Sequence, residues 1–313
     1  MTSEDVVNAL TDRTAVAKVH ADVLSTATSG ANLGNHLVGL LVWPTASREQ
    51  LRSMSREAIK ETFSHQGWRL TAAFANKCEA CISPSNHLAR ILIDEGRLTA
   101  PCYVRPNGIN TKQYRDADPA DSPIEKNPGE KFIISVARLS PEKRQRALIE
   151  AIPFIPDTSI KLVLVGGGPY EPELRMRAEE LSVTDRVIFT GMQPSDRVAA
   201  LLKQADVFSL ASYHFDNQPM TFLEAASSGL PIVYCDEQMT EGLTERNAVL
   251  TDGIEGENLA QAFNELFSDP ERMERLSRGS LDVAQEFDST TVAEKMVSLY
   301  EELIRSYRPL SHY

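Results

Sequence analysis

The stretch from Asp206 to Asp236 constrains the fold of this chain more than any other part of the sequence. It opens with an apolar run, residues 207–211, that is long enough for a buried strand of a parallel sheet. A polar loop follows, and Pro219 stands where a helix would begin, which suits proline because the first helical N–H has no partner. Gly229 marks the end of that helix, and a second apolar strand comes next. The sequence therefore predicts a strand–loop–helix–strand unit of the kind that builds parallel α/β sheets.

The loop and helix of this stretch also carry candidate ligand-binding groups. Asp216 and Glu224 are separated by seven residues and bracket the start of the helix. The N–H groups of Met220 and Thr221 belong to the first helical turn, where they have no intrahelical partner and attract anions. We therefore expect a phosphorylated sugar to bind here.

Strands and helices alternate with unusual regularity beyond residue 130, which predicts a doubly wound parallel sheet. The expected strands cover residues 132–136, 161–165, 186–190, 207–210, 231–234 and 248–250. The expected helices cover residues 142–152, 171–181, 195–203, 220–228, 258–267, 270–286 and 291–307.

The first third of the chain is less regular. Residues 2–29 begin with a short helix, and residues 33–43 fit either a strand or a buried helix. The basic, amphipathic helix expected over residues 47–63 fits packing on a domain core as well as contact with an anionic membrane. The remaining expectations are a helix over 69–77, a strand over 80–83, a helix after Pro84 ending near Gly96, a strand over 102–105 and an irregular linker over 111–130.

Charge and cysteine content exclude several classes of protein. The net charge is −12, and residues 114–313 carry 20 basic against 34 acidic side chains, which argues against nucleic acid as a partner. Residues 1–113 carry 12 basic against 10 acidic side chains and would tolerate an anionic membrane surface. Four cysteines and a polar start without a signal peptide indicate a cytoplasmic protein. The lone Cys78-x-x-Cys81 pair favours core packing over a metal site.

A second group of candidate residues follows the first two strands of the predicted sheet. The first strand ends at Arg138, and a turn brings Lys143 back to the same carboxyl end of the sheet. A glycine-rich turn with Gly166 and Gly168 follows the next strand, and glycine lets the backbone approach a ligand closely. Since ligands collect at the carboxyl ends of parallel strands, we expect these turns to face the Met220 helix.

Three motifs resemble those of the family-4 retaining glycosyltransferases, which have the GT-B fold. The first is the acid-x7-Glu pattern followed by G-L-P-I, and the second is R-x4-K in VARLSPEKR. The third is P-S at the end of one strand and P-N-G-I at the end of a later one, at Pro84, Ser85 and residues 106–109. The sequence departs from the family pattern at Asp216, Asn110 and Arg144, where Glu, Asp and Gly are usual.

The resemblance implies an α/β fold of the GT-B class with two Rossmann-like domains, the first incomplete and the second a doubly wound parallel sheet. It divides the chain into a partial acceptor-side domain (1–112), a linker (113–130), a nucleotide-sugar donor-binding domain (131–288) and a C-terminal crossover helix (289–313). The family's opening strand, glycine-rich loop and first-domain histidine have no counterpart, since His20 and His36 lack the surrounding pattern. An N-terminally truncated, non-catalytic nucleotide-sugar-binding protein that self-associates is therefore the alternative interpretation.

The resemblance also implies the site. Arg138 and Lys143 would stabilise the leaving diphosphate without a metal, Asp216 would contact the transferred hexose, and Glu224 would bind the ribose. No cofactor is expected. The further donor-binding residues are Gly166, Gly168, Met192, Gln218, Pro219, Met220 and Thr221.

The expected reaction is transfer of a hexose from a nucleotide-sugar, with a UDP-sugar favoured, to a lipid or glycan acceptor with retention of configuration. The run D-N-Q-P-M-T at residues 216–221 is similar to E-T-Q-G-L-T of bacterial diacylglycerol glucosyltransferases, which favours a lipid acceptor. Peripheral contact with the inner face of the membrane would then occur through the 47–63 helix. A sugar-nucleotide epimerase is disfavoured by the two charged motifs.

Overall fold

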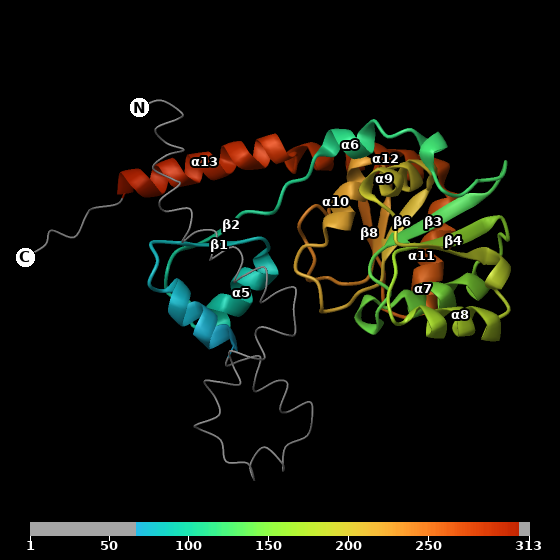
Figure 1. Cartoon of the computed structure of the whole chain (residues 1–313), viewed down its shortest axis with the longest axis horizontal. Coiled ribbons are helices and arrows are strands. Elements are labelled where there is room, and N and C mark those ends of the chain that lie inside the picture. Colours follow the sequence, from blue (N-terminus) through green and yellow to red (C-terminus); the bar gives the residue numbers. More distant parts are fainter. Residues whose placement is uncertain (1–66, 307–313) are drawn as a thin grey trace, which may run out of the picture. The chain divides into compact units, whose positions relative to one another are not determined.

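The computed structural model describes residues 67–306, which divide into two compact units (Figure 1). Residues 67–81 and 88–102 belong to the first unit, and residues 82–87 and 103–306 belong to the second. The elements predicted over residues 2–29, 33–43 and 47–63 lie outside the described residues.

The described part of the first unit has a small hydrophobic core of its own. A helix over residues 67–75 and helix α5 (Asn86–Asp94) pack with Cys81 of strand β1 (Cys81–Ser83). Strand β2 (Cys102–Val104) pairs with β1 in a two-stranded sheet. These elements follow the predicted ones within a few residues. The buried side chains of this core are Ala72, Cys81, Leu88, Leu92 and Leu98.

The second unit is built on a six-stranded, fully parallel sheet. Its strands are β3 (Lys131–Val136), β4 (Ile160–Val165), β5 (Val187–Gly191), β6 (Val207–Leu210), β7 (Ile232–Tyr234) and β8 (Ala248–Leu250). Their order is β5-β4-β3-β6-β7-β8, and every neighbouring pair is parallel. The chain thus proceeds outward from β3 to one edge, returns to the centre, and proceeds from β6 to the other edge. This is the doubly wound order of dinucleotide-binding folds, and the prediction of such a sheet is confirmed.

Helices cover both faces of this sheet, as Figure 1 shows. Helices α7 (Gln145–Ala151), α8 (Glu171–Glu180) and α11 (Gly256–Ser268) pack on one face, against alternate strand residues such as Ile133 and Leu162. Helices α6 (Thr111–Arg115), α9 (Ser195–Gln204) and α10 (Met220–Ser227) pack on the other, against Phe132 and Val163. Because both faces are buried, the strands read as continuous apolar runs rather than as alternating ones.

Two predicted segments differ from the structure. The helix expected over residues 142–152 is split into a 3₁₀ turn (Pro141–Lys143) and α7, because Arg144 adopts a left-handed backbone with φ of 51°. The segment expected to be an irregular linker contains α6 and a second 3₁₀ turn (Pro119–Asp121). Helix α6 has too few residues to show a period in the sequence, and burial of Thr111 and Tyr114 holds it in place.

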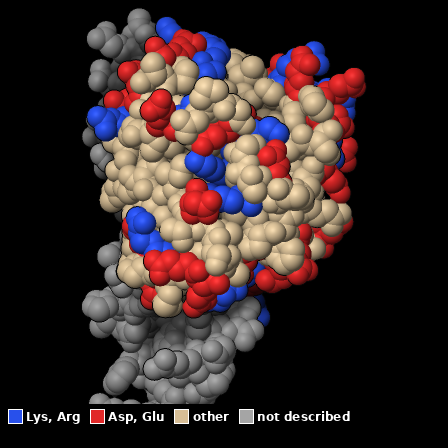
Figure 2. Space-filling view, turned by 90° about the vertical axis from the view of Figure 1, so that its right-hand side faces the viewer, with Lys and Arg blue, Asp and Glu red and all other residues tan. Residues whose placement is uncertain are grey.

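Two long helices complete the second unit. They are α12 (Pro270–Glu286) and α13 (Ser289–Ser306), and the predicted crossover of the last helix to the first domain stays a prediction. None of the helices within residues 67–306 is long and apolar enough to span a bilayer. On the face shown in Figure 2, Lys and Arg side chains are interspersed with Asp and Glu.

Candidate functional site

The strand order of the second unit indicates where a ligand can bind at the sheet. The connections leaving β3 and β6 go to opposite faces and opposite edges, so the switch point, where open α/β sheets bind their ligands, lies between the carboxyl ends of these two central strands. Arg138 and Lys143 follow β3, and the loop of residues 212–218 follows β6. The predicted charged residues thus come from the two strands that flank the switch point.

Lys143 and Asp216 meet at this point in an ion pair. The Nζ atom of Lys143 lies 2.5 Å from Oδ1 of Asp216, and their side chains are only 17% and 13% exposed. The hydroxyl of Ser212 donates to the other carboxylate oxygen of Asp216 at 2.6 Å. The ammonium also lies 5.3 Å from the centre of the Phe215 ring. A cation and an acid are therefore held together at low exposure, where charge interactions are stronger than in water.

Arg138 is more exposed than Lys143 and pairs with a different acid. Its guanidinium donates to Glu142 at 2.5 Å, and its side chain is 66% exposed. Glu142 also accepts from Ser140 at 2.7 Å, and hydrogen bonding with Ser140 and Arg138 holds the pKa of Glu142 below its usual range although burial raises it. The backbone of Arg138 is fixed through its carbonyl, which accepts from Gln145 at 2.8 Å. The structure brings only Lys143 to Asp216, and it gives Arg138 a separate acidic partner.

Helix α10 begins directly after the loop that carries Asp216. Pro219 is the residue before the helix, and among the described residues no hydrogen bond uses the N–H of Met220 or Thr221. These two donors and the helix dipole make the start of α10 attractive to an anion. The predicted donor-binding residues Pro219, Met220 and Thr221 thus lie at an open helix N-terminus.

Gln218 has a partner that the sequence did not indicate. Its side-chain oxygen accepts from the backbone N–H of Asn107 at 2.8 Å and from the Asn107 amide at 3.0 Å. Its own amide donates to the Asn107 carbonyl at 3.2 Å. Asn107 belongs to the P-N-G-I motif, so the amide of Gln218 ties the loop before α10 to that motif.

Glu224 lies one turn into α10 and is partly buried. Burial raises the pKa of Glu224, and the nearby phenol of Tyr114 on α6 acts in the opposite direction. Burial and the neighbouring carboxylate raise the pKa of Tyr114 far above its usual range, so the phenol remains a donor.

The predicted glycines have a packing role at the switch point. Gly166 has φ of 134°, a conformation that other residues rarely adopt, and a Cβ there would meet the carbonyl of Ala137. A Cβ at Gly168 would meet the carbonyl of Leu139. These glycines therefore allow the turns after β3 and β4 to touch. Met192 follows β5, is 83% exposed, and lies against Gly167.

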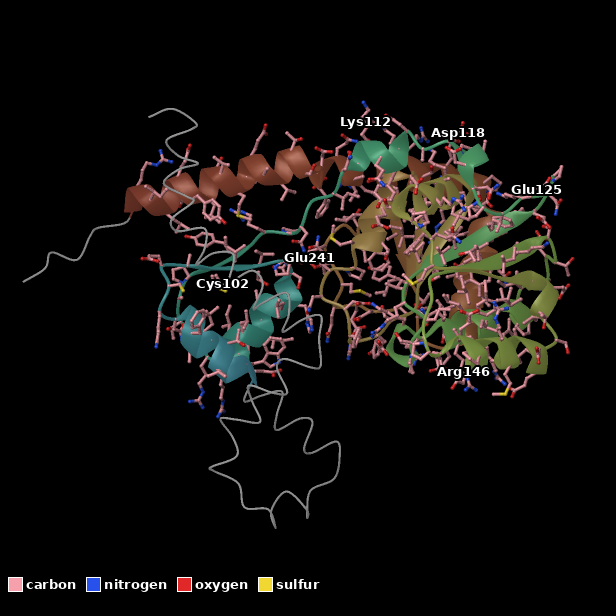
Figure 3. All side chains as sticks on the ribbon, in the orientation of Figure 1. Cys102, Lys112, Asp118, Glu125, Arg146 and Glu241 are labelled. Carbon is pink, nitrogen blue, oxygen red and sulfur yellow. The ribbon has the colours of Figure 1, made fainter. Side chains whose placement is uncertain are left out.

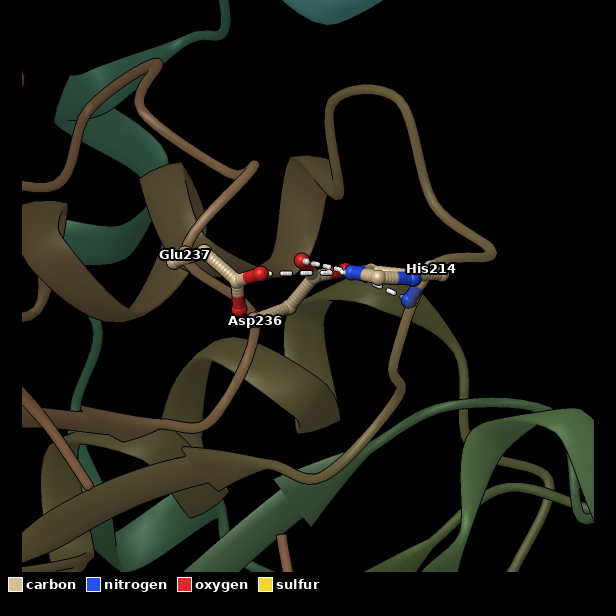
Figure 4. A group of neighbouring side chains, drawn as sticks. All are labelled: His214, Asp236 and Glu237. Carbon is tan, nitrogen blue, oxygen red and sulfur yellow. Dashed lines mark hydrogen bonds and ion pairs between the residues drawn. The ribbon is translucent and has the colours of Figure 1, made fainter. Parts of the chain in front are cut away.

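A third group of side chains anchors the loop that carries Asp216 (Figure 4). His214 has φ of 52°, and its N–H donates at 2.7 Å to the carboxylate of Asp236, which is buried just beyond β7. The imidazole lies 3.4 Å from Glu237 and stacks on Tyr213. Within the described residues, His214, Asp236 and Glu237 form a group whose potential metal-ligand atoms lie within 4.8 Å of one another. Both oxygens of Asp236 already accept backbone N–H groups, from His214 and Gln238, so the visible role of Asp236 is to anchor the loop.

Several residues of this region were not singled out from the sequence as site residues. They share a polar group that bonds or lies near a predicted site residue or its loop, and they are Asn107, Tyr114, Glu142, Ser212 and Asp236. A signal existed only for Asn107, which stands in a recognised motif, and for Ser212 and Asp236, which directly follow strand residues.

Taken together, the doubly wound sheet, the charged residues at its switch point and the unpaired N–H groups at the start of α10 define a Rossmann-like domain with a candidate site for an anionic ligand. The chain belongs to the family described as glycosyl transferases group 1, which it matches over residues 116–281. This assignment confirms the resemblance seen in the sequence.

Two curated bacterial proteins illustrate the relationship. The chain is 30% identical over 173 residues to an alpha-monoglucosyldiacylglycerol synthase of Streptococcus pneumoniae, covering 52% of this chain and 39% of that protein. It is 28% identical over 260 residues to a GDP-mannose-dependent alpha-(1-6)-phosphatidylinositol monomannoside mannosyltransferase of Mycolicibacterium smegmatis, covering 77% and 61%. The chain thus spans about two fifths of the first relative and three fifths of the second.

A solved structure shows the same fold. The structure of Anabaena HepE in complex with UDP matches with a TM-score of 0.69 at 24% identity, covering 78% of this chain and 69% of that one. The fold is α/β, with structural neighbours of the GT-B class, as predicted.

Proposed function

We propose that this protein is a retaining glycosyltransferase that moves a hexose from a nucleotide-sugar, with a UDP-sugar favoured, to a lipid or glycan acceptor. The observation that carries the proposal is the Lys143–Asp216 ion pair at the switch point, beside the open start of α10. Membership of the glycosyl transferases group 1 family supports the reaction class.

The donor would bind through its diphosphate and its ribose. Lys143 and the N–H groups of Met220 and Thr221 offer positive charge and hydrogen bonds to the diphosphate, and Arg138 adds a second cation at the rim. Glu224, one turn further along α10, is placed to accept hydrogen bonds from ribose hydroxyls. Gly166, Gly168 and Met192 line the turns after β4 and β5, where we place the base. Gln218 would act by fixing the loop before α10.

The chemistry follows from this arrangement. The bond between the anomeric carbon and the diphosphate oxygen breaks, and its electron pair stays on the phosphate, where Lys143 and the α10 donors stabilise it. The acceptor hydroxyl adds to the same face of the sugar, and its proton passes to the leaving phosphate oxygen. Asp216 would contact the hexose hydroxyls and orient the ring. On this route the chain needs no nucleophile of its own and no metal ion.

A lipid is the preferred acceptor. The two bacterial relatives are named for a glucosylated diacylglycerol and a phosphatidylinositol mannoside. The similarity of residues 216–221 to diacylglycerol glucosyltransferases adds to this, and glycan acceptors remain the alternative. The same proposal includes peripheral contact with the inner face of the membrane through residues 47–63.

The test is a donor panel assayed for binding and for transfer. Purified protein is titrated by calorimetry with UDP, GDP, UDP-glucose and GDP-mannose, and then incubated with each sugar nucleotide and diacylglycerol in mixed micelles. Micromolar binding of one nucleotide, with the sugar linked in the donor's configuration, supports the proposal. Binding without transfer to lipid or glycan would reduce the function to nucleotide-sugar binding, and absence of binding would contradict it.

A further inference from the structure

We propose that Phe215 is a positioning residue that holds the ammonium of Lys143 in place for the diphosphate of the donor. This inference rests on the function proposed above, and it assigns a role in donor binding to an aromatic ring that stands outside the charged motifs of the site.

The loop after β6 fixes the residues on both sides of Phe215. His214, which precedes it, has φ of 52°, and its N–H donates to the carboxylate of Asp236 at 2.7 Å. Asp216, which follows it, accepts from the hydroxyl of Ser212 at 2.6 Å. Phe215 itself is 52% exposed. The anchored neighbours, rather than burial of the ring, therefore determine where Phe215 lies.

The ring of Phe215 lies beside the ammonium of Lys143. The Nζ atom is 5.3 Å from the ring centre, within the distance of about 6 Å at which the face of an aromatic ring attracts a cation. The same ammonium pairs with Asp216, and the side chain of Lys143 is only 17% exposed. Water therefore screens the attraction less than it would at an open surface.

The arginines that follow Lys143 in the chain have other partners. Arg144 donates to the carbonyl of Ile254 at 2.7 Å. Arg146 pairs with Glu150 of α7 at 2.9 Å, and Figure 3 shows it at the outer surface of the second unit. Lys143 is therefore the cation that this turn presents to the ring.

A ring suits this position better than a second carboxylate would. A second acid would repel the diphosphate and would compete with it for the N–H groups of the ammonium. The ring face attracts the cation without carrying a net charge. A lysine ammonium has three N–H donors and Asp216 takes one, so the others stay available for phosphate oxygens.

The ring matters most when the donor is bound. In the proposed reaction the hexose hydroxyls donate to Asp216, the carboxylate that also holds Lys143. The attraction between the ring and the ammonium does not depend on that carboxylate, so Phe215 continues to hold Lys143 beside the diphosphate. A lysine side chain that is already held also loses less rotamer freedom when the ligand binds.

Calorimetric titration with UDP measures the contribution of the ring. Phe215→Leu keeps an apolar side chain and removes the aromatic face. Phe267→Leu is the matched control, because the Nζ atom of Lys131 lies 5.5 Å from the Phe267 ring centre and 3.0 Å from Asp157, away from the site. UDP affinity should fall about threefold to tenfold in Phe215→Leu and should equal that of the wild type in Phe267→Leu.

Fluorinated phenylalanines separate the charge distribution of the ring from its shape. Replacement of Phe215 by monofluoro-, difluoro- and trifluorophenylalanine keeps the ring nearly the same size, while each fluorine withdraws electrons from the ring face. UDP affinity should fall stepwise along this series, and the steps should be absent in a Lys143→Ala background. The double variant Phe215→Leu/Lys143→Ala should bind UDP as weakly as Lys143→Ala alone.

Every other outcome contradicts the inference. If the wild type binds UDP and the fluorinated proteins bind it equally well, Phe215 acts through packing or not at all, and the proposed function stands. If Phe215→Leu weakens binding further in the Lys143→Ala background, the ring does not act through the ammonium. If the wild type binds no nucleotide, the inference and the proposed function both fall. Should Phe215→Leu not fold, the fluorinated series decides.

Discussion

Replacement of Lys143 by alanine should weaken nucleotide-sugar binding and lower stability at the same time, for two separable reasons. The ammonium lies 2.5 Å from Asp216 at 17% side-chain exposure, beside the open start of α10. A hydrogen bond to a charged group is worth about 1.5–3 kcal/mol, so loss of the contact with the diphosphate should reduce UDP affinity about 10- to 100-fold.

The stability change follows from what the variant leaves behind. Without Lys143, the carboxylate of Asp216, which is 13% exposed, keeps the hydroxyl of Ser212 as its one partner within residues 67–306. An unsatisfied buried polar group costs about 1–3 kcal/mol, and for a domain of this size each kcal/mol lowers Tm by about 2–4 °C. The double variant Lys143→Ala/Asp216→Asn should recover much of the Tm but none of the UDP affinity.

Calorimetry with UDP and thermal unfolding measure the two effects. Lys131→Ala is the matched control, because Lys131 also pairs with an acid, Asp157, at 3.0 Å. It is the first residue of β3 and therefore lies at the end of the sheet opposite the candidate site. Its UDP affinity should equal that of the wild type. Unchanged UDP affinity in Lys143→Ala, or recovery of affinity in the double variant, would refute the assignment of Lys143 to the diphosphate.

Three further predictions concern the acid, the metal and the pH dependence. Asp216→Asn releases Lys143 from its partner, so UDP affinity should hold or rise while sugar transfer falls at least tenfold; equal losses of both would contradict a contact with the hexose. UDP binding should be the same in EDTA and in magnesium. If magnesium instead strengthens binding, and His214→Ala abolishes that gain, His214, Asp236 and Glu237 would be identified as a metal site. Hydrogen bonds from Lys161 and Asn127 lower the pKa of Glu130 from 4.5 to about 2, so this carboxylate stabilises the fold above pH 4.5 and loses that effect as the pH falls toward 2. The difference in Tm between wild type and Glu130→Gln should therefore be largest near neutral pH and shrink between pH 4.5 and 2, and a constant difference would show that ionisation of Glu130 is not its cause.

The strands, and with them the end of the sheet at which the candidate residues lie, could be predicted from the sequence. Buried parallel strands are continuous apolar runs, so all six strands from β3 to β8 lie within a residue of their predicted bounds. Residues that directly follow parallel strands lie at the same end of the sheet, whichever helices pack on its faces. That rule placed the turn with Lys143 beside the loop with Asp216, but it did not separate Lys143 from Arg138, which pairs with Glu142 instead.

The partners within the site could not be predicted, because they depend on loop backbones and on helix packing. Arg138 pairs with Glu142 only because the turn after β3 is a 3₁₀ turn that ends at a left-handed Arg144. Gln218 and Asn107 lie 111 positions apart. The proximity of Tyr114 to Glu224 requires α6, a helix too short to leave a periodic pattern.

The position of UDP in a crystal structure of the complex is the decisive measurement. We expect the diphosphate between the carboxyl ends of β3 and β6, with its oxygens about 3 Å from Nζ of Lys143 and from the N–H groups of Met220 and Thr221. We also expect ribose hydroxyls bonded to Glu224. A nucleotide bound elsewhere, or a diphosphate that contacts neither Lys143 nor the start of α10, would contradict the proposed site.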